Sequence, residues 1–187
     1  MNPISFAFTN YVDRNKLLVL ADSDIKSLAQ LDCKKVAVIA NSTQYDELIK
    51  YQAENNVNFH LRLITDNSVG LDLVKSGKVT GWYGQEILLE SILADSKHPT
   101  QYAFVEDSVV YEPMALMMRK ENQIFAGLVN QAMLSLFEDG TIDIIYNKWF
   151  RTKIPPNNIN LNIPLNDETK YDFENPNSLP KELYSLY

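Results

Sequence analysis

The feature that most constrains the fold is the alternation of short apolar runs with helical patterns between residues 34 and 105. Residues 36–40 form a continuous apolar run, typical of a strand that is buried on both faces. Similar strand patterns follow at 59–65, 79–83 and 102–105, and helical patterns at 43–54, 70–76 and 85–94 separate them. Because strands that alternate with helices need right-handed crossovers, this segment predicts an α/β fold with a parallel sheet.

Two further strand patterns, at 17–20 and 114–118, flank this α/β segment and suggest a hinge between two lobes. In the last part we expect helices at 124–137 and 141–150, an extended segment rich in Pro and Asn at 154–164, and a surface tail at 167–187.

Composition and charge exclude several classes of function. The formal net charge is −7 and no block of Lys and Arg occurs, which argues against nucleic acid as a partner. No apolar run approaches the roughly 20 residues that cross a bilayer, so no membrane insertion is expected. The first ten residues have neither a basic region nor a long apolar region, so we expect no signal peptide in this chain.

Side chains suited to catalysis or metal binding are few and scattered. Cys33 lies at a turn with no histidine nearby in sequence, and it is interpreted as a small turn residue rather than a nucleophile. His60 lies in a predicted strand and His98 in a loop, and neither has the clustered partners of a metal site. The six glycines form no phosphate-binding motif. We therefore expect no catalytic residue, no metal and no cofactor.

One helix start offers a binding site. Asn41, Ser42 and Thr43 follow the first buried strand, where unpaired N–H groups and hydroxyls suit a carboxylate; a simple helix cap is the alternative. Ligands in open α/β sheets bind at the carboxyl ends of strands, which leaves both interpretations open.

The aromatic pair and a hinge carboxylate also have two interpretations each. Trp82 and Tyr83, at the end of the third strand, either line a cleft or pack in the core. Glu112, at the hinge, either binds a ligand amine or is an exposed residue before a strand.

Four segments follow, in order, the pattern of one known family. Residues 24–38 read DIKSLAQLDCKKVAV, and residues 75–79 read KSGKV. Residues 111–120 read YEPMALMMRK, and NKWF at 147–150 is followed by IPPNNINLN. The chain resembles the polar amino-acid-binding proteins of ABC importers (bacterial solute-binding protein family 3), most closely the glutamate/aspartate-binding branch.

The resemblance implies a type II periplasmic-binding-protein-like α/β fold, in which two lobes close over one amino acid. It implies a partial first lobe with the first hinge strand at 1–21, a complete second lobe at 22–107, and the return strand, the C-terminal helices of the first lobe and an extended tail at 108–187. It places the ligand's anionic group at Ser42 and Thr43, beside Asn41, and the ligand amine near Gln85, with Trp82 or Tyr83 at the wall. Cys33 replaces the family's glycine, and Gly84-Gln85 stands where the family has an aspartate that holds the amine. The match begins only at FTNY, residues 8–11, so the family's signal sequence and the front of lobe one, with its carboxylate-binding arginine, have no counterpart.

The leading hypothesis is a non-enzymatic, N-terminally truncated solute-binding component of an amino-acid ABC importer, periplasmic by resemblance, with a permease as partner in complete relatives. The second hypothesis is a degenerate or repurposed fragment that acts by protein–protein association. In that case residues 17–20 and 114–118 would expose apolar faces or sheet edges, and a strand- or tail-swapped homodimer would cover them. A third, a cyclohexadienyl dehydratase with the same fold, would need catalytic carboxylates, and Glu112 alone is too little basis for it.

Overall fold

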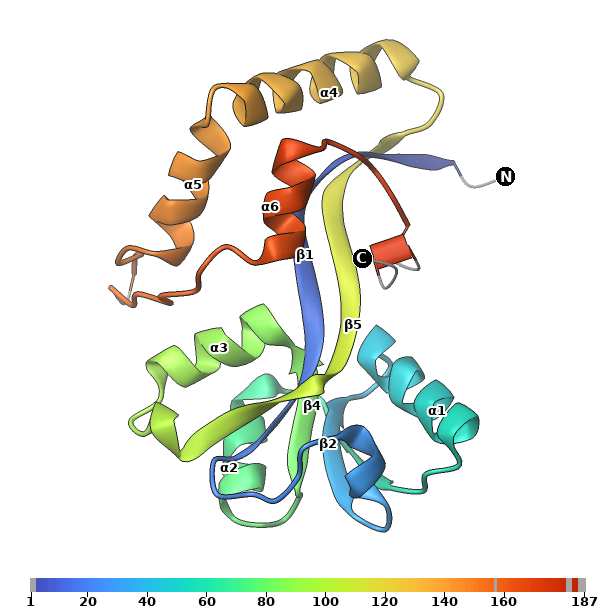
Figure 1. Ribbon diagram of the computed structural model, residues 1–187, viewed down its shortest axis with the longest axis vertical. Coiled ribbons are helices and arrows are strands. Elements are labelled where there is room, and N and C mark those ends of the chain that lie inside the picture. Colours follow the sequence, from blue (N-terminus) through green and yellow to red (C-terminus); the bar gives the residue numbers. More distant parts are fainter. Residues whose placement is uncertain (1–2, 157, 181–182, 185–187) are drawn as a thin grey trace. The chain divides into compact units, whose positions relative to one another are not determined.

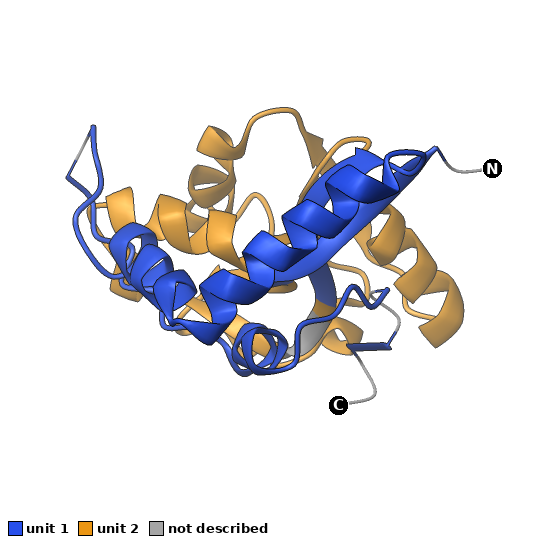
Figure 2. Ribbon diagram, turned by 90° about the horizontal axis from the view of Figure 1, so that it is seen from above, with its two compact units in different colours: residues 1–13, 111–187 blue, residues 14–110 orange. Residues whose placement is uncertain are grey.

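The computed structural model describes residues 3–156, 158–180 and 183–184, and only the backbone of residues 107–109. The chain divides into two compact units, described here one at a time: unit 1 comprises 1–13 and 111–187, and unit 2 comprises 14–110 (Figure 2). The predicted second lobe lies wholly within unit 2. The chain passes between the units twice, within two long strands, β1 (Ile4–Leu20) and β5 (Tyr102–Arg119).

The secondary structure follows the predicted alternation closely (Figure 1). Strand β4 begins at Gly81 rather than at residue 79, and the strands predicted at 102–105 and 114–118 are the two ends of one strand, β5. Pro113 does not interrupt β5 because this strand is last in the sheet order, and an edge strand tolerates a missing N–H donor. The remaining elements are η1 (Leu28–Leu31), β2 (Lys35–Ile39), α1 (Thr43–Asn55), β3 (His60–Ile64), η2 (Asn67–Val69), α2 (Gly70–Lys75), β4 (Gly81–Gln85), α3 (Glu86–Asp95), η3 (Pro99–Gln101), α4 (Gln123–Glu138), α5 (Thr141–Phe150) and α6 (Asp167–Glu174).

The strands form one sheet in the order β3-β2-β4-β1-β5. Strand β2 pairs in parallel with both β3 and β4, as predicted, whereas β1 runs antiparallel to β4 and makes the sheet mixed. Asn15 lies opposite Gln85, at the carboxyl end of β4. Residues 41–43, Gln85 and Asn15 therefore all lie toward one edge of the sheet, since β2 and β4 are adjacent and parallel.

Unit 2 has two apolar cores, one on each face of the sheet. Because successive side chains of a strand point to opposite faces, β1 sends Leu17 to one core and Leu18 to the other, and β4 sends Tyr83 and Trp82 to opposite cores. Helix α1 closes the first core through Leu48. Helices α2 and α3 close the second core through the buried residues Val74 and Leu89. This double burial explains why these strands read as apolar runs without alternation.

Unit 1 is assembled around aromatic stacking between β1 and α5. The ring of Tyr11 in β1 stacks on Phe150 of α5 with 5.8 Å between centroids, and Tyr146 stacks on the same ring at 4.4 Å. Helix α4 contributes Phe137, whose ring lies 5.3 Å from that of Phe173 in α6.

Among the described residues, no helix is both long enough and apolar enough to cross a membrane.

The surface tail predicted at 167–187 is wrong for its first part, which forms helix α6. Asn166 caps this helix by accepting a hydrogen bond from Thr169 N, and its side-chain amide donates to Val12 O at 2.7 Å. Thr169 Oγ1 in turn accepts from Val12 N at 2.9 Å. The start of α6 is therefore bonded to both backbone groups of one β1 residue, the N–H and the C=O of Val12. The local sequence signals for this helix are the cap residue Asn166 and the acids Asp167 and Glu168 in its first turn.

The turn before β2 explains the family's glycine at position 33. Cys33 has φ +59°, in the left-handed region, and is exposed. Its N–H donates to Asn58 O at 2.7 Å, which holds the turn in this conformation. A residue with a Cβ is strained in this region, and glycine is not.

Replacing Cys33 by glycine should therefore stabilise unit 2. The Cys33→Gly variant gains about 1–2 kcal/mol from relief of the left-handed strain and loses part of it to the greater freedom of glycine in the unfolded chain. The net increase in the free energy of unfolding, measured by urea denaturation, should be about 0.5–1 kcal/mol. Cys33→Ala is the control, because it keeps the Cβ; an equal gain in Cys33→Ala would assign the effect to the thiol instead.

Candidate functional site

The predicted helix start at residues 41–43 has the geometry of a capped helix N-terminus. Asn41 has φ +57°, which turns the chain from β2 into α1, and Ser42 is the N-cap. The Ser42 hydroxyl accepts a hydrogen bond from Tyr45 N at 3.2 Å and donates to Ile39 O at 2.8 Å. Ser42 therefore caps α1, and a ligand there would meet the positive end of the α1 dipole.

Gln85 completes the same edge of the sheet. It is the last residue of β4, half-buried, and occupies the N-cap position of α3 without a side-chain capping bond. Because β4 lies next to β2, the chain leaves both strands at adjacent positions on one edge. The structure thereby brings the starts of α1 and α3 to one edge of unit 2.

Trp82 and Tyr83 do not form a wall at this edge. Both side chains are 1% exposed, and each belongs to one of the two cores of unit 2. A Cβ on Gly70 would lie 2.3 Å from Cε3 of Trp82, so the indole packs directly on the α2 backbone. Core packing, which the sequence left open, corrects the expectation that these rings line a cleft; the reason is that β4 is central and covered on both faces.

Glu112 lies in the part of β5 that belongs to unit 1 and is half-buried. The other predicted site residues all belong to unit 2. Its grouping with Ser42 and Gln85 in one site stays a prediction.

The same edge also carries a charged cluster that the sequence patterns did not predict. Lys16 Nζ lies 2.9 Å from Glu86 Oε1 and 3.1 Å from Glu106 Oε2, and Arg14 Nε lies 2.7 Å from Glu86 Oε2. The Lys16 side chain is only 4% exposed, and its ammonium lies 5.7 Å from the centroid of the Phe104 ring. A sequence signal for this cluster is that Arg14 and Lys16 stand just before the apolar run 17–20, because charges next to a buried strand need partners.

A polar chain extends this cluster toward α1. Asn15 is fully buried; its amide donates to Glu47 Oε2 at 2.8 Å, and its carbonyl oxygen accepts from Gln44 at 3.1 Å. The Tyr83 hydroxyl also donates to Glu47, at 3.4 Å. These contacts link the starts of α1 and α3 through β1 and β4, so the edge is held in place by side-chain hydrogen bonds.

A second buried carboxylate lies in unit 1. Asp172 accepts hydrogen bonds from the Tyr184 hydroxyl at 2.5 Å and from the Asn177 amide at 2.7 Å. Burial raises the pKa of Asp172, and the two hydrogen bonds act in the opposite direction. The carboxylate joins the end of the chain to α6, which is a structural role.

The described residues offer little for catalysis. Within them, no group of three His, Cys, Asp or Glu side chains could hold a metal ion. His60 and His98 are both exposed, and Cys33 Sγ has Asp32 as its neighbour at 3.7 Å.

Residues 4–152 match the family described as bacterial extracellular solute-binding proteins, family 3. The glutamate/aspartate import solute-binding protein of Escherichia coli (strain K12) is 29% identical over 173 residues, which cover 92% of this chain and 57% of that protein. The L-glutamate/L-aspartate-binding protein of Pseudomonas aeruginosa is 26% identical over 155 residues, which cover 83% and 51%. The chain therefore spans little more than half the length of these relatives.

Solved structures of amino-acid-binding proteins have a similar fold. An ancestral arginine-binding protein bound to arginine has a TM-score of 0.64 and 26% identity, with 79% of this chain and 64% of that chain covered. The probable amino-acid ABC transporter extracellular-binding protein of Bacillus subtilis has a TM-score of 0.66 and 20% identity, with 77% and 63% covered. The predicted family and the predicted periplasmic-binding-protein-like fold are both confirmed.

The charged cluster makes a specific prediction about stability. In Glu86→Gln, the buried ammonium of Lys16 loses one of its two carboxylate partners, so the free energy of unfolding should fall by about 2–4 kcal/mol. The matched control is Glu54→Gln, which removes the exposed pair between Lys50 and Glu54 and should cost less than about 0.5 kcal/mol. Equal effects in chemical denaturation would contradict a structural role for the cluster.

Proposed function

Because the chain belongs to family 3 of the bacterial extracellular solute-binding proteins, we propose that it is the amino-acid-binding part of an ABC importer's solute-binding protein, with no enzymatic activity. The observation that supports this most is the shared edge at which β2 and β4 end, with the start of α1 beside Gln85. In open α/β sheets, ligands bind outside the carboxyl ends of the strands.

We assign the ligand's carboxylate to the first turn of α1. The helix dipole and the backbone N–H groups at Thr43 favour an anion there. Ser42 stabilises the turn as the N-cap, and the left-handed conformation of Asn41 directs the chain from β2 into α1. Gln85 is assigned to the ligand amine. A neutral amide in place of a carboxylate weakens a bond to an ammonium by about 1–2 kcal/mol.

The proposed ligand class is a polar or acidic amino acid. The two curated relatives are named for glutamate and aspartate, which supports this class. For the protein as a whole we propose an ABC permease as partner and a location outside the cytoplasmic membrane, as the family description implies.

Calorimetric titration with glutamate, aspartate, glutamine and arginine tests the proposal. Gln85→Asp, which restores a charge opposite the amine, should tighten binding of the preferred amino acid by about fivefold to thirtyfold. Gln123→Asp is the control, because it adds the same charge at the exposed first turn of α4. A flat titration with every amino acid in both the original chain and Gln85→Asp would rule out amino-acid binding by this chain.

A second function, self-association, is favoured by apolar side chains on α4 and α5. Ile124 is 82% exposed, Leu128 is 61% exposed and Ile144 is 68% exposed. Soluble monomers rarely expose large contiguous apolar patches. Part of the expectation from the sequence is wrong: Leu17, Leu18 and Val19 are buried in the cores of unit 2. Of residues 114–118, Leu116 and Met117 are strongly exposed.

Light scattering coupled to gel filtration tests self-association through α4. A dimer at micromolar concentration that Ile124→Glu/Leu128→Glu converts to a monomer would support it. The matched control is Gln123→Glu/Gln131→Glu, which adds the same charges on exposed positions of the same helix. A monomeric original chain, or equal dissociation by the control, would contradict it.

A further inference from the structure

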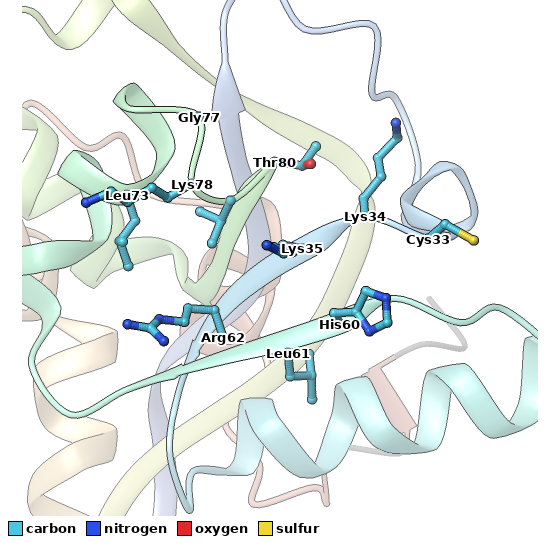
Figure 3. A pocket seen from close by; sticks show the side chains of 11 residues that line it. Cys33, Lys34, Lys35, His60, Leu61, Arg62, Leu73, Gly77, Lys78 and Thr80 are labelled. Atoms are coloured by element: carbon cyan, nitrogen blue, oxygen red, sulfur yellow. The ribbon is translucent and has the colours of Figure 1, made fainter.

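A groove lined by basic side chains lies at the end of unit 2 where β2 and β3 begin. It has a volume of about 730 Å³ and is bounded by the first residues of these strands, the end of α2 and the turn that leads into β4 (Figure 3). Its basic lining residues are Lys34, Lys35, His60, Arg62 and Lys78. The groove is at the amino ends of the strands, so it is separate from the site proposed for the amino acid.

The strand register brings three of these side chains to one face of the sheet. Lys35 is the direct partner of His60, and Arg62 is the partner of Ala37, so all three point to the face that carries the second core. Ile64, two residues further along β3, belongs to that core. The basic positions remain open because α2 is only six residues long and ends at Lys75.

The groove has no built-in counter-charge. No acidic residue is among its described lining residues, and among the described side chains none forms an ion pair with Lys35, Arg62 or Lys78. The neighbouring Asp32 accepts a hydrogen bond from Asn58 N at 2.9 Å instead. Like charges gathered in a concave surface repel one another unless a bound anion offsets them. This positive cluster occurs in a chain whose net charge is −7.

The shape and the donors indicate the kind of anion. A volume near 730 Å³ lies in the range of small-molecule sites. A hollow of this size favours a small anion over a folded partner. The backbone N–H groups of the turn are already used, since Gly77, Lys78 and Thr80 donate to Val74, Leu73 and Lys35 carbonyls. Recognition therefore depends on ammonium and guanidinium groups, which bind phosphate oxygens well.

We propose that this groove binds a multiply charged, free phosphate anion, a polyphosphate or a nucleotide. A singly charged carboxylate would leave most of the positive charge uncompensated, which separates this site from the amino-acid site. Binding should weaken with added salt, because the basic side chains of the groove are exposed.

Titration with tripolyphosphate, with ATP and with phosphatidylglycerol vesicles tests the proposal, with phosphatidylcholine vesicles as the neutral reference. The triple variant Lys35→Gln/Arg62→Gln/Lys78→Gln should lose at least about tenfold in affinity for the ligand that binds. The control triple variant Lys26→Gln/Lys50→Gln/Lys97→Gln removes the same charge from exposed positions of unit 2 outside the groove, and should change affinity less than about twofold.

Each outcome has a defined meaning. Groove-dependent binding of tripolyphosphate or ATP supports the proposal. Groove-dependent binding of phosphatidylglycerol vesicles alone, whose headgroups carry one charge each, would overturn it. Absence of binding in every arm, equal losses in both triple variants, or tighter binding of polyglutamate than of tripolyphosphate would overturn the proposal. Lys78→Gln alone, in the turn, keeps the test valid if the triple variant does not fold, and an unchanged glutamate titration separates this site from the amino-acid site.

Discussion

The double burial of the central strands is the constraint on which the rest of unit 2 depends. Strands β1, β2 and β4 send alternate side chains into two separate cores, so helices must cover both faces of the sheet. That requirement sets where α1, α2 and α3 lie, and it confines polar function to the ends of the strands. Both sites proposed for this chain lie at such ends, the amino-acid site at the carboxyl edge and the basic groove at the opposite one.

The buried charged and polar side chains at the start of the unit 2 part of β1 are paired. Lys16 and Asn15 belong to a strand whose next residues are wholly apolar, yet both are buried, because Glu86 and Glu47 reach them from α3 and α1. The same contacts connect the two helix starts that flank the proposed ligand position. A site of this kind is held by charge pairing and hydrogen bonds, which gives it a defined geometry before any ligand arrives.

Much of the fold could be predicted because its signals are local. The apolar run 36–40 and the capping residue Ser42 each act within a few residues, and both appear in the structure where the sequence placed them. The predictions failed where distant residues decide. From the sequence, Trp82 could line a cleft or fill a core, and the helices on both faces of β4 decide that it fills a core. Helix α6 depends on a hydrogen bond to Val12, more than a hundred positions away in the chain.

The sequence by itself determined the family, the α/β class, the order of the elements and the helix start that is proposed to receive an anion. It did so because apolar periodicity, capping and motif order are written along the chain. The tertiary structure decided which strands are buried on two faces, which charges meet around Lys16, and that Lys35, His60 and Arg62 share one open face. These depend on strand register and on the length of α2, and they emerge only when segments far apart in sequence pack together.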